Sequence, residues 1–297
     1  MGVTQWWRGG AGGGFAGNHV VWAAEPTRSD AAPPADDSHL ADMCRTTADA
    51  LKPRLGDDCT LIVRSPYVLA GDLTEKQLVE WHEATIAPAS RAMAQQYFKA
   101  APSEPITILL FSGEESYRRY AKHLFNDEGV TIYGYYRSEK RTLVMNIATG
   151  GGTLVHELTH ALIDFDFPKV PDWFNEGLAS LYEQCRFREN GVGIEGLPNW
   201  RLPALQEAIR RERLRPLEDL IAADDFRGAE VGLNYAEARY FCLYLQDRGK
   251  LEDFYRRFKA DHATDPHGSA AALAVSGAAD WKSLNREYRE FVLSLKF

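Results

Sequence analysis

Residues 153–180 read TLVHELTHALIDFDFPKVPDWFNEGLAS, and this stretch predicts both a local fold and a chemistry. His156 and His160 are one helical turn apart, so on a helix both imidazoles lie on one face and can reach one ion. Glu157 is rotated by about 100° from His156, which places its carboxylate beside that ion and not on it. Apolar residues at helical spacing around the histidines favour a helix for this segment.

A third ligand is expected from Glu176, sixteen residues after His160. A second helix that begins near Pro171 would bring this carboxylate toward the two imidazoles. Two histidines and one carboxylate leave a fourth position for water, which is the arrangement of catalytic zinc. The sequence therefore predicts one Zn²⁺ ion held by His156, His160 and Glu176. The alternative is a buried helix with two hydrogen-bonded histidines.

Acidic residues follow the second histidine and predict partners for the imidazoles. Asp164 comes four residues and Asp166 six residues after His160. Metal-bound imidazoles usually donate their other N–H to such a group. We therefore expect a carboxylate behind at least one histidine.

The HELTH motif followed by WFNEGLA at 173–179 resembles the gluzincin metallopeptidases, in particular the peptidase-MA-like group of compact bacterial proteins. The similarity is strongest over residues 153–183 and extends more loosely from Pro105 to Phe258. It implies a zincin fold, a zinc ion on His156, His160 and Glu176, and Glu157 as general base.

The resemblance also bears on the substrate. Relatives of aminopeptidase N carry a Gly-x-Met-Glu-Asn segment that holds the free amine of the substrate, whereas this chain has Val144-Met145-Asn146 with no glutamate after the methionine. We therefore expect an endopeptidase acting on a peptide or protein. Related enzymes stabilise the oxyanion with a tyrosine or histidine of the helical lobe, and Tyr235 is the first candidate here and Tyr240 the second. For either residue, an ordinary core or surface tyrosine is the alternative.

The order of expected elements predicts an α+β fold, a small mixed sheet followed by the metal helix and a mainly helical lobe. The 297 residues suit two lobes, which we place at 41–150 and 151–297. Hydrophobic alternation, capping residues and glycines predict the elements. We expect strands at 60–63, 67–70 and 106–111, and a hairpin of 133–136 with 142–146. Helices are expected at about 40–51, from Thr74 onward, and at 112–124, 203–213, 217–222, 235–248, 251–259 and 281–295.

The strand at 142–147 leads directly into the metal helix. If it forms the edge of the sheet, its backbone groups could bind an extended peptide, as zincins do. If it is an interior strand, it makes no such contact, and the sequence does not separate the two cases.

Residues 1–40 differ from the rest in composition. Glycine-rich and Ala/Pro-rich runs favour a disordered leader. Between them, the mildly apolar segment 15–24 ends in Ala23-Ala24 and could be a weak secretory signal. A flexible leader or a mis-assigned start explains it equally well, so the cell compartment stays open, with export consistent with the resemblance.

Bulk properties exclude several classes of partner. A formal charge of −8 argues against nucleic acid, and no apolar run is long enough for a membrane-spanning helix. We interpret the run Arg210–Arg215 as a solvated helix face. The four cysteines show no C-x-x-C spacing, which argues against a thiolate zinc site. Cys44 and Cys59 could pair in an exported protein, and Cys185 and Cys242 are expected on apolar faces of helices.

Two other functions remain compatible with the motif. One is a binding or scaffold protein with a structural or vestigial zinc site, although such a site has no use for Glu157. The other is a metal-dependent hydrolase of a non-peptide bond, because the same arrangement activates water whatever the water attacks. Cleavage preference and oligomeric state are beyond the sequence.

Overall fold

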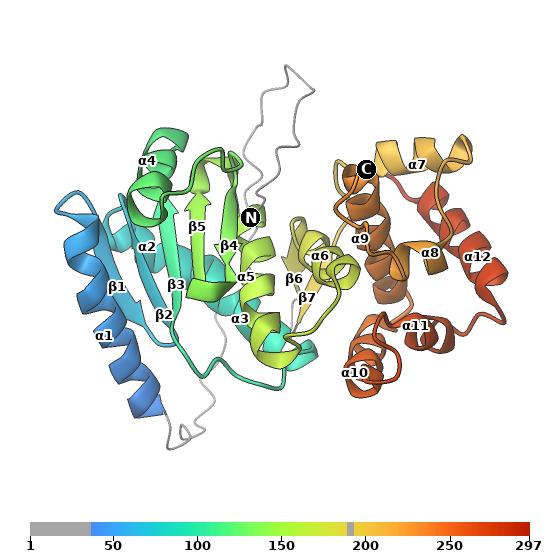
Figure 1. Cartoon of the computed structure of the whole chain (residues 1–297), viewed down its shortest axis with the longest axis horizontal. Coiled ribbons are helices and arrows are strands. Elements are labelled where there is room, and N and C mark those ends of the chain that lie inside the picture. The colour runs from blue at the N-terminus through green and yellow to red at the C-terminus, as the bar shows by residue number, and fades with distance from the viewer. Residues whose placement is uncertain (1–36, 189–192) are drawn as a thin grey trace. The chain divides into compact units, whose positions relative to one another are not determined.

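The computed structural model describes residues 37–188 and 193–297, which form two compact units (Figure 1). The sheet unit comprises the described residues up to 87 together with 102–157, and the helical unit comprises 88–101, 158–188 and 193–297. Most of the expected leader lies outside the described residues, and Asp37 to Leu40 already belong to the first helix. The α+β class predicted from the sequence is confirmed.

A five-stranded mixed sheet organises the sheet unit (Figure 1). The central strand β3 is buried along its whole length, as its apolar, β-branched sequence predicts. It pairs in parallel with β2 on one side and with β5 on the other, while β1 and β4 run antiparallel at the two edges. The strand order is β1 (Thr60–Arg64), β2 (Tyr67–Gly71), β3 (Ile106–Phe111), β5 (Thr142–Asn146) and β4 (Gly134–Arg137).

The strand at 142–147 is an interior strand, which is the second of the two cases that the sequence left open. Strand β5 lies between β3 and β4, with Thr142 beside Thr107 and Asn146 beside Phe111 in the parallel pairing with β3. The predicted hairpin is present, and it places β4 outside β5. Local sequence specifies the hairpin but not which of its strands pairs with β3, because β3 is distant in the sequence.

Helices α1 (Asp37–Leu55) and α4 (Glu114–Phe125) pack their apolar residues on one face of this sheet, against alternate residues of β2, β3 and β5. Helix α2 (Glu75–Trp81) passes behind the sheet in the view of Figure 1. It begins with the predicted capping box of Thr74 and Gln77 and continues through a π-helical turn, His82–Ile86, into α3 (Ala87–Gln96).

The helical unit is built around α9 (Val231–Asp247), which packs most extensively on α6 (Asp172–Leu181). Their contact is aromatic, because Trp173 of α6 packs against Phe241 of α9, and Phe254 of α10 packs on the same tryptophan. The unit also contains almost all of α3 and the second half of the helix at Gly151–Asp166 (α5). Its other helices are α7 (Leu202–Arg210), α8 (Leu217–Ile221), α10 (Leu251–Asp261), α11 (Ser269–Ser276) and α12 (Trp281–Ser294).

Two elements of this unit were not expected from the sequence, namely α11 and a hairpin of β6 (Cys185–Phe187) with β7 (Ile194–Gly196). The helix predicted for Cys185 is wrong, since this residue begins β6. Strands of three residues are too short to show the alternating pattern that would have indicated them. Cys242 lies buried on α9 as expected. All four cysteines are free in this structure, including Cys44 and Cys59.

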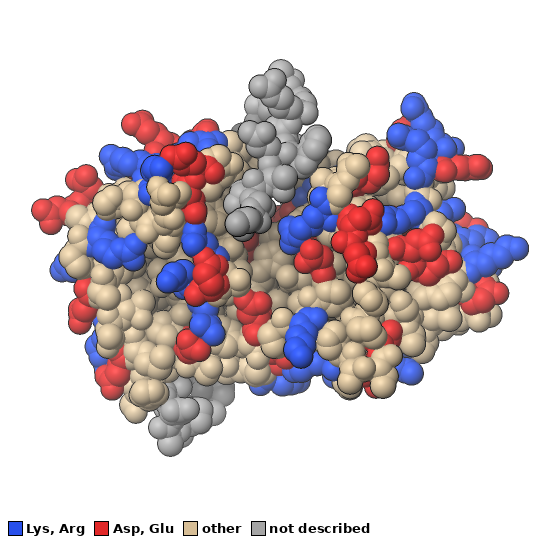
Figure 2. Space-filling view, in the orientation of Figure 1, with Lys and Arg blue, Asp and Glu red and all other residues tan. Residues whose placement is uncertain are grey.

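Charged residues of both signs are interspersed over the face shown in Figure 2. The interpretation of the run at 210–215 as a helix face is wrong for most of its length, because α7 ends at Arg210 and Leu214 is buried. Its start is solvated, since Arg211 forms an ion pair of 2.6 Å with Glu207 of α7 and both side chains are exposed. Among the described residues, no helix combines the length and apolarity needed to span a membrane.

Candidate metal centre

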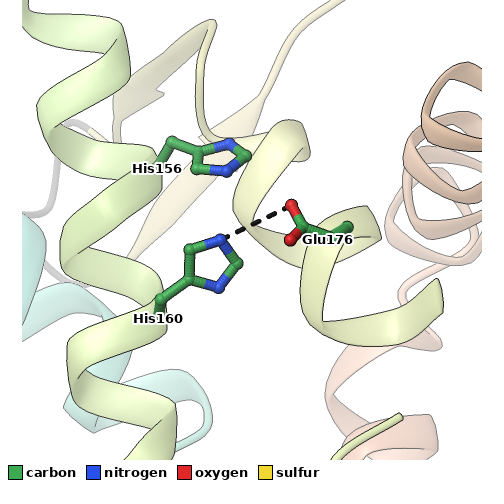
Figure 3. Close-up of side chains that lie close together, drawn as sticks. All are labelled: His156, His160 and Glu176. Carbon is green, nitrogen blue, oxygen red and sulfur yellow. Dashed lines mark ion pairs between the residues drawn. The ribbon is translucent and has the colours of Figure 1, made fainter. Parts of the chain in front are cut away.

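Helix α5 (Gly151–Asp166) carries the two histidines. The chain enters it through Gly150, whose φ of 100° is a conformation that favours glycine. Because one helical turn separates them, His156 and His160 project from the same side of α5 (Figure 3). Both residues are only 8% exposed, so water is largely removed from the two imidazoles.

Glu176 reaches the histidines from α6, which begins after Pro171 as expected (Figure 3). The residue is 4% exposed, and its Oε2 lies 3.5 Å from Nε2 of His160. One potential ligand atom from each of His156, His160 and Glu176 lies within 4.8 Å of the other two. The structure thus brings together the three side chains that the sequence predicts as ligands.

The ring orientation of His160 is fixed from its other side. Its Nδ1 lies 2.8 Å from Oδ1 of Asn175, the residue before Glu176. With Nδ1–H donating to this amide oxygen, the lone pair of Nε2 points toward Glu176, which is the tautomer that metal binding requires. Asn175 stands inside the WFNEGLA segment, but its role was not recognised from the sequence.

The expected role of Asp166 as a partner of a metal-binding histidine is wrong. Its Oδ1 accepts hydrogen bonds of 2.7 Å from the backbone N–H groups of Lys99 and Ala100. Its Oδ2 accepts a hydrogen bond from the hydroxyl of Tyr255 and forms an ion pair with Lys259. Although burial opposes ionisation, these donors together hold the pKa of Asp166 below its ordinary value. Asp166 therefore anchors the chain before β3 to the end of α5, and the same suggestion for Asp164 stays a prediction.

Glu157 follows His156 on α5 and is not part of the group of three potential ligands. It is partly buried, between Leu158 and His156, which are buried. Burial is the main reason that the pKa of nearby Tyr117 on α4 is raised, and the charge of Glu157 adds to it. Glu157 is therefore a partly buried acidic residue on the helix that carries both histidines.

Arg227 holds the other oxygen of Glu176, a contact that sequence reasoning missed. Its Nη2 donates to Glu176 Oε1 over 2.5 Å, its Nε to Asp172 Oδ2 over 2.9 Å, and its Nη1 to the hydroxyl of Tyr235 over 3.1 Å. Burial alone would lower the pKa of Arg227, but the surrounding acceptors outweigh it and raise the pKa above its ordinary value. No local signal marks this arginine, which lies 51 residues from Glu176 in a connection without regular structure.

The two candidate tyrosines have different surroundings. Tyr235, near the start of α9, is partly buried and reaches the Glu176 cluster through Arg227. Tyr240 is fully buried, and its hydroxyl accepts from the backbone N–H of Asn199 over 2.9 Å and lies 3.2 Å from its carbonyl. Tyr240 therefore joins α9 to the chain before α7, and Tyr235 alone remains a candidate.

Helix α9 fixes the position of α6. A Cβ at Gly177 would lie 3.0 Å from the carbonyl oxygen of Ala238, so only glycine allows the two helices to approach this closely. The buried Arg239 donates to the carbonyls of Ser180, over 2.9 Å, and Leu197, and satisfies part of the C-terminal end of α6. Burial lowers the pKa of this guanidinium to about 10.

The donor set fits a divalent transition metal. Two buried imidazoles and one carboxylate, with the carboxylate and one imidazole each held by a further hydrogen bond, match the ligands and outer partners of catalytic zinc sites. Within the described residues, His156, His160 and Glu176 form the group of histidine, cysteine and acidic side chains that can hold such an ion.

No model of a known protein family matches the chain, and no curated protein matches it significantly. The likeness to gluzincins therefore rests on the residues of α5 and α6.

Proposed function

We propose that this protein is a zinc-dependent peptidase with a zincin-like fold, most simply an endopeptidase. The observation that carries the proposal is the buried group of His156, His160 and Glu176, with Glu157 next to the first histidine on the same helix. A purely structural zinc site needs four protein ligands and no additional carboxylate, whereas a hydrolytic site needs three ligands and a base.

The donor set also occurs in iron oxygenases, which bind Fe(II) through two histidines and one carboxylate. Glu157 favours zinc hydrolysis, because a base beside the open position serves water activation and has no part in that iron chemistry. When bound, zinc lowers the pKa of water to about 7 and polarises a carbonyl group.

The residues of this chain supply the remaining steps. His156, His160 and Glu176 would hold the ion. Glu157 would accept a proton from the attacking water and deliver it to the leaving amine of the cut peptide. Tyr235, whose hydroxyl is held by Arg227, is the proposed donor to the oxyanion that develops on the scissile carbonyl.

A peptide substrate is supported by the sheet. Strand β4 is an edge strand of the sheet and pairs with β5. Strand β5 continues through the 3₁₀ turn Ile147–Thr149 into α5. An extended peptide can add to such an edge by backbone hydrogen bonds. Because β5 is interior, we propose β4 as the strand that binds an extended peptide.

The direct test is to incubate the zinc-loaded protein with a diverse peptide pool and to map cuts by mass spectrometry. We expect internal cuts that disappear with a chelator and return when zinc is added. Zinc binding without any cut would favour a structural site or a non-peptide substrate, and cuts that survive chelation would contradict metal-dependent catalysis.

A further inference from the structure

One guanidinium connects the proposed third ligand, the start of α6 and the start of α9. Arg227 contacts Glu176 through Nη2, Asp172 through Nε and Tyr235 through Nη1. Its side chain is 53% exposed, whereas that of Glu176 is 5% exposed. Arg227 therefore reaches from the surface to a carboxylate that is otherwise enclosed by protein.

We propose that Arg227 is a positioning residue that fixes Glu176 as a ligand through one oxygen and places the hydroxyl of Tyr235 at the same time. The proposal rests on the metal site described above. A carboxylate can bind a metal through one oxygen or through both. Arg227 engages Oε1, while Oε2 is the oxygen that lies 3.5 Å from Nε2 of His160, so the guanidinium selects which oxygen meets the metal.

The geometry explains why an arginine stands here. Asp172 precedes Glu176 by one helical turn, so their carboxylates lie on one side of α6. A guanidinium has donors in a rigid plane and can contact both carboxylates and a hydroxyl together, whereas a lysine offers a single point charge on a flexible stem. Asp172 thus orients Arg227, and Arg227 orients Glu176 and Tyr235.

The test compares Arg227→Lys, which keeps the charge but loses the planar donor array, with Arg227→Ala, which loses both. Zinc-loaded proteins are mixed with a chromogenic chelator, and the rate of zinc release is measured. Loss of an outer partner of a metal ligand typically weakens metal binding by about 10- to 100-fold, so we expect release to be about that much faster in both variants.

A second readout reports the coordination itself. In protein loaded with Co²⁺, the visible bands of a four-coordinate site are stronger than those of a five-coordinate site. We expect strong bands in the wild type and weaker bands in both variants, because Glu176 is then free to bind through both oxygens. A change in folding alone would not produce this signature in a protein with an unchanged circular dichroism spectrum.

Arg215→Lys is the matched control, because Arg215 also contacts two side chains of the helical unit, Asp225 and Asn234, but neither is a proposed ligand. It should release zinc at the wild-type rate. If the Arg227 variants do not fold, Asp172→Asn removes the anchor of Arg227 and should speed release by a smaller factor.

The role of Arg227 would be overturned if both Arg227 variants released zinc at the wild-type rate and kept the wild-type Co²⁺ spectrum. It would also be overturned if only Arg227→Ala differed from the wild type, because Arg227→Lys would then be sufficient. The zinc and cobalt readouts decide the question even if no peptide is cut, which separates it from failure of the peptidase proposal. A wild-type protein that binds neither metal would overturn both.

Discussion

Helices α5 and α6 both provide proposed metal ligands, but they are held in place in different ways. In α5 the spacing of one helix aligns His156 with His160. In α6 the single ligand, Glu176, depends on residues far away in sequence, namely Arg227 at its carboxylate and Ala238 and Arg239 against its helix. The proposed catalytic motif is therefore local, whereas the position of the proposed third ligand depends on the packing of the helical unit.

The largest effect should come from a change on α5 that leaves α6 untouched. Glu157→Gln removes the proposed base but no ligand, so hydrolysis should fall by about 10²- to 10⁴-fold while zinc content stays unchanged. Peptide cleavage and elemental analysis of the same sample measure both. Retained hydrolysis would remove Glu157 from its role, and lost zinc would show that it acts in binding.

The support of α6 can be broken at Arg239. Arg239→Met leaves buried carbonyls at the end of α6 without their donor, which should lower the free energy of unfolding by about 3 kcal/mol, even though removing a buried charge recovers part of the loss. Urea unfolding measures this change. Arg248→Met on the surface of the same region should cost less than about 1 kcal/mol, and equal losses in the two variants would contradict the assigned role.

Helix α9 also carries a buried carboxyl that makes the support dependent on pH. Burial raises the pKa of Glu237 to about 8, although Arg215 and Arg289 oppose the shift. The folded protein therefore holds a proton that the unfolded chain releases near pH 4.5, and this residue makes the protein less stable as pH rises from about 4.5 to 8.

Glu237→Gln should remove this slope, which amounts to at most about 1.4 kcal/mol per pH unit. Urea unfolding of both proteins at pH 5, 6, 7 and 8 measures it, since other carboxylates contribute equally to the two curves. We expect the variant to gain stability relative to the wild type as pH rises, and parallel curves would contradict the raised pKa.

The smallest effect is expected where α6 touches α9. Gly177→Ala places a methyl group against the backbone of Ala238, so α6 must shift, at a cost of about 1 to 2 kcal/mol and with weaker zinc binding. Gly232→Ala on α9 meets no atom within 4 Å and should be neutral or stabilise by up to about 1 kcal/mol. Zinc titration and thermal unfolding of both variants measure these effects. If Gly177→Ala were as neutral as Gly232→Ala, the close approach of α6 to α9 would not require glycine at position 177.

The same contrast explains what could be predicted from the sequence. The two helices of the site, the central strand β3 and the capping box at Thr74 follow from local spacing, and the structure has them. The three proposed ligands also lie together, because a short connection between α5 and α6 limits where Glu176 can go.

The errors and omissions concern distant contacts. Whether β5 lies at the edge depends on its pairing with β3, and the partner of Asp166 depends on α10, 89 residues away at Tyr255. Arg227 has no pattern around it that distinguishes it from any surface arginine. The three-residue strands β6 and β7 are too short to show an alternating pattern, so the sequence does not predict their hairpin.

The most direct test of the three-ligand zinc site is X-ray absorption at the zinc edge of the zinc-loaded wild-type protein. We expect only nitrogen and oxygen ligands around the zinc, at about 2.0 to 2.2 Å, with the outer-shell scattering of two imidazoles. A sulfur ligand at about 2.3 Å, or scattering from fewer than two imidazoles, would contradict a site made by His156, His160 and Glu176.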